Sequence, residues 1–73
     1  MKDEELRQII RNNLIQCRTE KGLTQSELGK AIGKSPTAVA SWEQGLSLPD
    51  LTTLYQLSKL YGKTISYMYG EED

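Results

Sequence analysis

The chain has 73 residues, including nine Lys plus Arg, ten Asp plus Glu, one Cys and no His. This length fits one small domain over residues 1–73. Its fold has to rest on an apolar core, because one cysteine cannot form an internal disulfide and the ligands for a zinc site are missing. Without imidazole, and with no evident activator for Cys17 or any serine, we expect neither an enzyme nor a metal or other cofactor.

The charges are distributed unevenly along the chain. Residues 3–5 and 71–73 hold six of the ten acids, whereas residues 6–70 carry eight bases and four acids, a net charge of +4 in a chain whose total is −1. A local basic surface attracts phosphate even when the whole chain is acidic. A mixed, solvated surface explains the same charges equally well. We expect the acidic ends, residues 1–5 and 71–73, to fray.

The sequence also indicates a location for the protein. No segment approaches the roughly 18 to 20 continuous apolar residues of a membrane-spanning helix. The acidic start differs from a signal peptide, which begins with basic residues and continues with an apolar run. Together with the single thiol, these features predict a cytoplasmic protein.

The first two helices are predicted by apolar spacing and by capping residues. Apolar residues that recur every three or four positions predict a helix over residues 3–21, which Gly22 ends. Thr24 and Glu27 have the pattern of a capping box, so a second helix is expected from Thr24 to Gly33. The residues expected to face inward are Leu6, Ile10, Leu14 and Cys17 in the first helix and Leu28, Ala31 and Ile32 in the second.

Two further helices follow from the same signals. Ser35 as a cap and Pro36 as the first helical residue predict a third helix that stops at Gly45. Only a turn of about three residues separates it from the second helix. Asp50 caps a fourth helix that Gly62 ends. The apolar residues expected to face inward are Val39 and Trp42 in the third helix and Leu51, Leu54, Leu57 and Tyr61 in the fourth.

Residues 64–69 fit two structures. One is a short helix with Ile65 and Met68 inward, and the other is a strand with Ile65, Tyr67 and Tyr69 on one face. A lone strand finds no partner in an otherwise helical chain and would need a second chain to pair with. We therefore favour the helix.

Two capped helices joined by a short turn have the form of a helix-turn-helix unit, whose second helix fits the major groove of DNA. The residues that narrow this form to one family are Gly22-Leu23-Thr24-Gln25-Ser26-Glu27-Leu28, Gly33, Ser35, Val39, Ser41, Trp42-Glu43-Gln44-Gly45 and Pro49. In this order and spacing they resemble the phage-repressor and Cro-like helix-turn-helix family, also called the xenobiotic-response-element family. The resemblance covers roughly residues 10–70, with the motif core at about 24–45.

The resemblance implies an all-α, compact four- to five-helix bundle of the lambda-repressor-like DNA-binding type. It implies that Arg18 and Glu43 form a structural ion pair, which orients the third helix against the first. The core positions that it implies are Ile10, Leu14, Leu28, Ile32, Val39, Trp42, Leu51, Leu54 and Leu57.

The resemblance also implies which residues contact double-stranded DNA. The phosphate contacts are Gln25, Lys30, Lys34 and Gln44, and the base contacts are Ser35, Pro36, Thr37, Ala38 and Ser41. Residues 35–41 include no Arg, Lys, Asn or Gln, the side chains that make bidentate bonds to purine edges. We therefore expect the site to be read partly through thymine methyl groups and partly through DNA shape.

The last nineteen residues hold four of the five aromatic side chains of the protein. We assign Tyr61 to the core. Tyr and Met are typical of interface cores, and members of the family that this chain resembles often dimerise through this segment. We therefore expect Tyr67, Met68 and Tyr69 to form a homodimer interface, with the dimer bound to a pseudo-palindromic operator.

The expected function is that of a sequence-specific DNA-binding transcriptional regulator of bacterial or phage type, most simply a repressor that occupies its operator. Two alternatives stay open. One is a protein-interaction module, for example an antitoxin whose tyrosine-rich end binds a protein partner. The other is one domain of a longer repressor.

Overall fold

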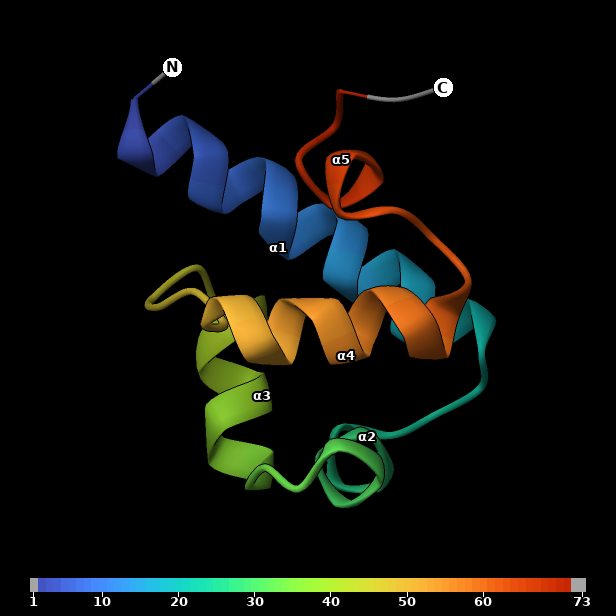
Figure 1. Ribbon diagram of the computed structural model, residues 1–73. Coiled ribbons are helices and arrows are strands. Elements are labelled where there is room, and N and C mark those ends of the chain that lie inside the picture. Colours follow the sequence, from blue (N-terminus) through green and yellow to red (C-terminus); the bar gives the residue numbers. More distant parts are fainter. Residues whose placement is uncertain (1, 72–73) are drawn as a thin grey trace.

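The structure is a computed structural model that describes residues 2–71, and this part of the chain contains five helices and no strand (Figure 1). The helices are α1 (Asp3–Glu20), α2 (Gln25–Ile32), α3 (Pro36–Glu43), α4 (Leu51–Tyr61) and α5 (Ile65–Met68). The all-α bundle expected from the sequence is confirmed, and residues 65–68 form the helix rather than the alternative strand.

The acidic ends are described only in part. Residues 3–5, which we expected to fray, form the first turn of α1. Acidic side chains are favourable there, because the first turn of a helix has the positive end of the helix dipole. Residues 1, 72 and 73 lie outside the described part of the chain.

The predicted capping residues begin the helices. Thr24 Oγ1 accepts a hydrogen bond from the Glu27 N–H at 3.0 Å, and Glu27 Oε1 accepts one from the Thr24 N–H at 2.8 Å, so the capping box of α2 is complete. The predicted caps Ser35 and Asp50 begin α3 and α4, and Thr64, which was not predicted as a cap, begins α5. Each side chain accepts a hydrogen bond from the N–H three residues later. Local sequence therefore fixes where these helices start.

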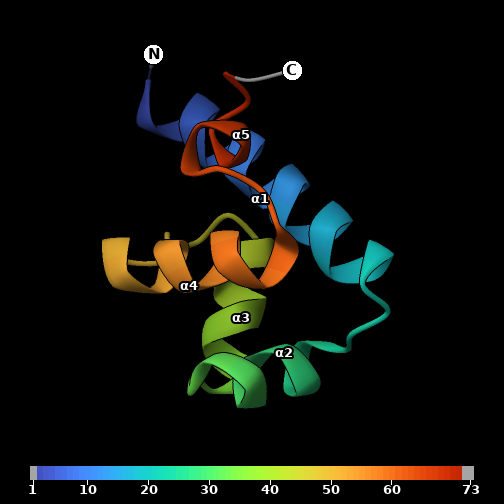
Figure 2. The same cartoon turned by 45° about the vertical axis from the view of Figure 1, so that its right-hand side comes forward.

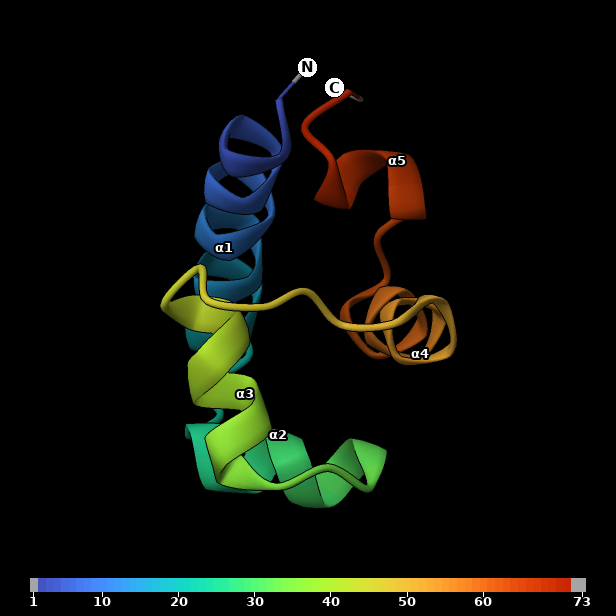
Figure 3. The same ribbon diagram turned by 90° about the vertical axis from the view of Figure 1, so that its left-hand side faces the viewer.

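The helices are arranged around α4. In Figures 1 and 2, α4 crosses the middle of the molecule, with α5 on one side and the pair α2 and α3 on the other. The long helix α1 contacts both α3 and α5, and α2 contacts α3 and α4. Residues 2 and 71 lie at the same end of the molecule, away from α2 (Figure 3). This arrangement presents α2 and α3 together at the opposite end.

One apolar core holds the bundle together. Its buried residues are Ile10, Leu14, Cys17, Leu28, Val39, Trp42, Leu54, Leu57 and Met68. Most of these were expected from the spacing, but two inward assignments are wrong. Ala31 is exposed, and Leu51 is 72% exposed, whereas Thr53 is 1% exposed in the core. At about 100° per residue, Ala31 and Leu51 each lie about 90° or more from the centre of the buried face of their helix.

The short helix α5 is anchored on α1. Met68 is fully buried in the core, and the side-chain amide of Asn13 donates hydrogen bonds to the carbonyls of Tyr67 at 3.2 Å and Met68 at 3.0 Å. The bond to Met68 satisfies a carbonyl at the end of the helix, and the Tyr67 carbonyl also accepts from the Gly70 N–H at 2.9 Å. Met68 therefore cannot form a dimer interface in this fold, which corrects the prediction, and Tyr67 and Tyr69 are half-buried beside the core.

Gly29 lies where α2 and the following turn come closest together. A Cβ atom on Gly29 would stand 2.5 Å from the Lys34 carbonyl oxygen, and the Lys34 N–H donates to the Gly29 carbonyl at 2.7 Å. Any side chain here would push the backbone of the turn away from α2.

We expect Gly29→Ala to lower the free energy of unfolding. Alanine gains up to about 1 kcal/mol of helix propensity, but overpacking against backbone costs about 1–3 kcal/mol. Urea unfolding followed by circular dichroism measures the balance, with Gly29→Val as the more severe variant. A more stable alanine protein would show that the turn can move away at little cost.

Tyr61 has a half-buried side chain whose hydroxyl has no hydrogen-bond partner among residues 2–71. Burial raises the pKa of Tyr61 well above its usual range, and the neighbouring Cys17 and Glu43 raise it further. Above pH ~10 the unfolded tyrosine ionises while the folded one keeps its proton, so the unfolded state binds fewer protons and stability falls as pH rises.

Tyr61→Phe is expected to make this alkaline loss of stability smaller. The same change removes a buried hydroxyl without a partner, so stability at neutral pH should rise by about 1 kcal/mol. Unfolding in urea at a series of pH values tests both effects, and Tyr55→Phe, at an exposed position, is the control. If Tyr61→Phe and Tyr55→Phe lose the same stability at alkaline pH, Tyr61 is not the group whose ionisation destabilises the fold.

Candidate nucleic-acid interface

The helix-turn-helix consists of α2, the turn formed by residues 33–35, and α3. Gly33 has φ +72°, in the left-handed region, and its N–H bonds to the Gly29 carbonyl, so the turn reverses the chain directly after α2. Ser35 Oγ accepts a bond from the Ala38 N–H at 3.1 Å and begins α3. The two helices pack tightly against each other, which leaves the outer side of α3 open to solvent.

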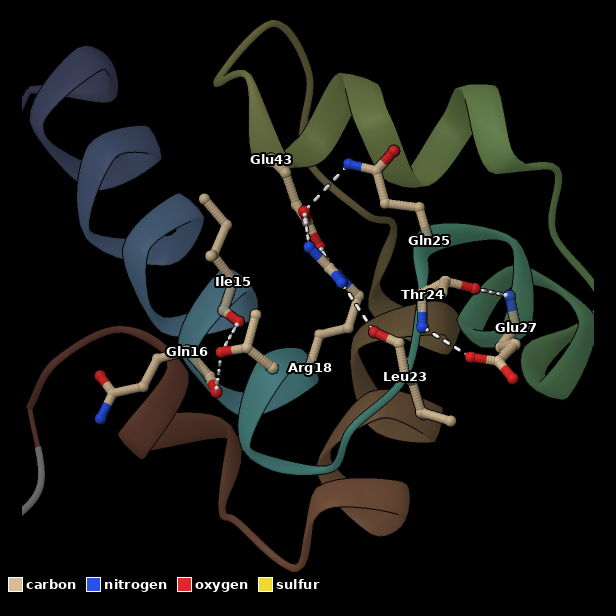
Figure 4. Close-up of polar contacts among 9 residues, drawn as sticks. Ile15, Gln16, Arg18, Leu23, Thr24, Gln25, Glu27 and Glu43 are labelled. Carbon is tan, nitrogen blue, oxygen red and sulfur yellow. Dashed lines mark hydrogen bonds and ion pairs between the residues drawn. The ribbon is translucent and has the colours of Figure 1, made fainter.

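A chain of hydrogen bonds joins α1, the start of α2 and the end of α3 (Figure 4). Arg18 Nε lies 2.7 Å from Glu43 Oε2 and Arg18 Nη2 lies 2.9 Å from Glu43 Oε1, a bidentate pair. Arg18 Nη1 also donates to the Leu23 carbonyl at 2.7 Å, and Gln25 Nε2 donates to Glu43 Oε1 at 3.1 Å. The structure thus brings Arg18 and Glu43 together as the resemblance implies and adds Gln25 to them.

Burial makes this network important for the fold. The Glu43 side chain is only 5% exposed and that of Arg18 is 15% exposed. The hydrogen bond to Glu43 raises the pKa of Arg18 above its usual value, against the opposing effect of burial. A carboxylate at this depth needs its partners, because an unpaired buried charge is strongly unfavourable.

The four residues expected to contact phosphates lie around α2 and α3. Lys30, Lys34 and Gln44 are exposed, and Gln44 follows the last residue of α3. Gln25 is half-buried because its amide is held by Glu43. A neutral amide has two N–H groups, so one hydrogen of Gln25 Nε2 stays available for another acceptor.

The environment of Lys34 is mixed. The pKa of Asp50 is lowered mainly by its hydrogen bonds to Thr53, and the charge of Lys34 lowers it further. Lys34 therefore lies within electrostatic range of the carboxylate that caps α4. The negative charge of Asp50 therefore offsets part of the positive potential around Lys34.

The five residues expected to contact bases do not share one open surface. Ser35, Pro36 and Thr37 are exposed, and the Ser35 oxygen is occupied as the cap of α3. Ala38 is half-buried against the core, and Ser41 is half-buried with its Oγ 2.7 Å from Ser47 Oγ. Ala38 is thus less open than expected, because it lies one position from the fully buried Val39.

Ser47 is a residue of this surface that was not predicted. It lies in the loop after α3, and its hydroxyl meets Ser41 across a turn closed by the bond from the Leu46 N–H to the Ser41 carbonyl at 3.0 Å. No local sequence pattern predicts the bond between Ser41 and Ser47, because the bond depends on how the loop folds back onto α3. Helical spacing does place Gln44 on the same side of α3 as Thr37, seven residues earlier.

Two capped helices, a three-residue turn and an uncharged outer side on the second helix define a helix-turn-helix domain. The comparison with protein families agrees. The chain belongs to the helix-turn-helix family, whose model matches residues 14–68.

The curated relatives have corresponding names. The chain is 37% identical over 60 residues to the HTH-type transcriptional activator BcrR of Enterococcus faecalis, covering 82% of this chain and 29% of the relative. It is 36% identical over 58 residues to the uncharacterized HTH-type transcriptional regulator y4dJ of Sinorhizobium fredii, covering 80% of this chain and 75% of the relative. Multiprotein-bridging factor 1a of Arabidopsis thaliana is 32% identical over 53 residues, with coverages of 73% and 37%.

These matches have two consequences. The family match and the names of the relatives place the chain among helix-turn-helix domains. The chain spans less than a third of the length of BcrR. No solved structure matches the chain significantly.

Within residues 2–71, no helix has the length and apolar character needed to cross a membrane. The same residues contain no group of three His, Cys, Asp or Glu side chains placed to hold a metal ion.

Glu43→Ala is expected to lower the free energy of unfolding by about 3 kcal/mol, because Arg18 and Gln25 lose their shared acceptor and a partly buried guanidinium is left unpaired. Arg18→Met combined with Glu43→Leu should cost less than Glu43→Ala, since it removes both charges. Urea unfolding of the single and double variants measures the coupling. If Glu43→Ala and the double variant lost the same free energy of unfolding, the charges of Arg18 and Glu43 would contribute no more to stability than the packing of their side chains.

Proposed function

We propose that this chain binds double-stranded DNA in a sequence-specific way, with α3 in the major groove, and thereby regulates transcription. The observation that carries the proposal is a complete helix-turn-helix whose second helix begins with the exposed, uncharged residues Pro36 and Thr37. An α-helix fits a groove about 12 Å wide, and side chains on its outer side then reach the base edges. The helix-turn-helix family and the regulator names of the relatives support the same function.

Within this proposal, the lysines and amides position the domain on the backbone of DNA. Lys30 and Lys34 supply exposed positive charge, and Gln44 lies at the far end of α3. Gln25 donates to a phosphate with the N–H that Glu43 does not use, so its amide is already oriented before DNA arrives. The Glu27 carboxylate in the first turn of α2 offsets part of the positive end of the helix dipole. Most of the attraction for phosphate therefore comes from the side chains.

Thr37 is the residue to which we assign most of the base reading. Its hydroxyl and methyl are both exposed, and Ser35 and Pro36 lie beside it at the start of α3. Ser41 contributes through an oxygen whose partner, Ser47, fixes its position. Since hydroxyls bond to many base edges, the remaining discrimination comes from thymine methyl contacts with Pro36 and Ala38 and from DNA shape.

The direction of regulation depends on where the operator lies. We propose repression by occupancy, because a domain of this size blocks a promoter simply by binding over it. BcrR is named an activator, so a related domain also occurs in a protein that activates. We further propose that the protein acts in the cytoplasm as a homodimer on a pseudo-palindromic operator.

A protein-interaction module is the second candidate. It is favoured by the likeness to a protein named as a multiprotein-bridging factor. Stable co-purification with a non-identical protein, together with no selection of DNA sequences, would support it against the DNA-binding proposal.

Selection of bound duplexes from a random DNA pool tests the DNA-binding proposal, and the selected site then serves to compare variants. Thr37→Ala should relax the preference at one or two base pairs, with a loss of about 1–3 kcal/mol on the preferred site only. Lys34→Ala should weaken binding to all sequences and reduce the slope of log K against log salt by about 0.9.

Lys2→Ala, which removes the same charge at the far end of the molecule, is the control for Lys34→Ala. Enrichment of no motif at low salt would refute the proposed function. Equal salt slopes for the two lysine variants would remove Lys34 from the phosphate contacts.

A further inference from the structure

A groove lies between the C-terminal part of α4 and the start of α5. Its volume is about 460 Å³, and its lining residues are Tyr55, Ser58, Lys59, Gly62, Lys63, Thr64, Ile65 and Ser66. We call it the lysine groove. It lies toward the end of α4 that leads into α5, whereas the loop from α3 enters α4 at its other end (Figure 1). The groove is therefore separate from the proposed DNA-reading helix.

Hydrogen bonds hold the walls of the lysine groove in place. Gly62 has φ +67°, and the Lys63 N–H donates to the Ser58 carbonyl at 3.0 Å, so the turn that follows α4 is closed. The Ser58 hydroxyl donates to the Tyr55 carbonyl at 2.9 Å. Asn13 fastens α5 on α1 through two further bonds. The groove is thus formed before any partner arrives, as most binding clefts are.

The ammonium groups of the two lysines are placed by aromatic rings. Lys59 Nζ lies 5.3 Å from the centre of the Tyr55 ring, and Lys63 Nζ lies 4.6 Å from that of the Tyr67 ring. These contacts attract each ammonium to one position but use none of its three N–H donors. Neither lysine forms an ion pair within residues 2–71. Both positive charges therefore have donors free for an anionic partner.

The segment that forms the groove is positive. Residues 51–70 contain Lys59 and Lys63 and no acid. The acids that flank this segment, Asp50 and Glu71, do not line the groove. A partner that enters the groove therefore meets positive charge alone.

An adjoining hollow leaves this balance unchanged. It shares Lys63 with the groove and is also lined by Glu20 and Lys21, whose charges offset each other. The Glu20 carboxylate further accepts a hydrogen bond from the Gln16 amide at 3.3 Å. The net charge beside the groove stays positive.

The rest of the lining determines which kind of anion fits. Most of the exposed lining is apolar, and it includes the Tyr55 ring, which is 53% exposed, and the half-buried Ile65. Nucleic acid carries a charge on every phosphate and is bound through rows of cations. Two lysines beside apolar surface instead complement a peptide segment that has a few acids and apolar side chains among them.

The acidic ends of the chain itself fit this description less well. Residues 3–5 and 71–73 are each a run of three acids without an apolar side chain. They match the charge of the lysine groove but not its apolar lining. The expected occupant is therefore a different protein.

We propose that the lysine groove binds an acidic, partly apolar segment of a second, non-identical protein. Carboxylates of that segment bond to Lys59 and Lys63, and one of its apolar side chains packs against Tyr55 and Ile65. This inference goes beyond the proposed function, because the groove lies away from α3 and is accessible when α3 is in the major groove. The domain then holds DNA and a protein partner through separate surfaces.

Peptide selection is the first test. A display library of random peptides about twelve residues long is selected on the immobilised full chain, and the selected peptides should carry two or more acids and a large apolar residue. The most frequent peptide is then synthesised and titrated into nitrogen-15-labelled protein. The amide shifts that it causes should cluster at residues 55–66.

Charge reversal measures what the lysines contribute. Lys59→Glu and Lys63→Glu should each weaken binding of the synthesised peptide at least about tenfold, because a like charge then faces its carboxylates. Lys2→Glu makes the same change at the start of α1, away from the groove, and should have no effect. Tyr55→Ser should also weaken binding, since the ring no longer packs against the peptide. Circular dichroism shows that each variant is folded.

Titration with the selected DNA duplex separates this inference from the proposed function. Lys63→Glu should bind the duplex as the wild-type protein does, because Lys63 lies away from α3. If no duplex is bound while the peptide still binds at residues 55–66, the proposed function fails and the assignment of the groove stands.

Several outcomes would overturn the inference. They are selection of no peptide or of peptides without acids, equal peptide affinities of Lys63→Glu and Lys2→Glu, and peptide shifts that cluster outside residues 55–66. Shifts within that range that are caused by the duplex would assign the groove to DNA. Shifts there that are caused by raising the concentration of the protein alone would assign it to a second copy. Either result would also overturn the inference.

Discussion

The hydrogen bonds that converge on Glu43 are the constraint on which the proposed interface depends. Glu43 ends α3, yet its carboxylate is held by Arg18 from α1 and by Gln25 from the first turn of α2. One buried group thus fixes the angle between the two helices of the motif and their position against α1. Such a pair is weak evidence for stability by itself, because its desolvation is costly, but it specifies geometry, since side chains from α1 and α2 both bond to one carboxylate on α3.

A second, smaller contact extends this constraint to the surface. The bond between Ser41 and Ser47 joins α3 to the loop that carries Leu46 and Leu48. The end of α3 and the loop that follows it are therefore joined by a side-chain bond as well as by the backbone bond from the Leu46 N–H to the Ser41 carbonyl.

Local signals determined most of what could be predicted from the sequence. The capping box at Thr24 and Glu27, the cap at Ser35 and the helical spacing of Ile65 and Met68 each depend on residues within one turn, and each is present in the structure. The inward assignment of Leu51 is wrong because the buried side of α4 is centred on Thr53, Leu54 and Leu57, about 90° away around the helix. The inward position of Met68 was predicted correctly from its spacing, but its assignment to a dimer interface is wrong, because α5 docks on α1 through the amide of Asn13, 55 residues earlier in the chain.

The composition of α3 limits how strongly one domain can discriminate between bases. Its outer side offers hydroxyls and methyl groups, which discriminate between bases less than Arg, Asn or Gln do. The net charge of the middle of the chain is modest, and Lys34 shares its field with Asp50, so nonspecific attraction is modest too. Under the proposed function, discrimination by one domain therefore depends on hydroxyl and methyl contacts and on DNA shape more than on charge.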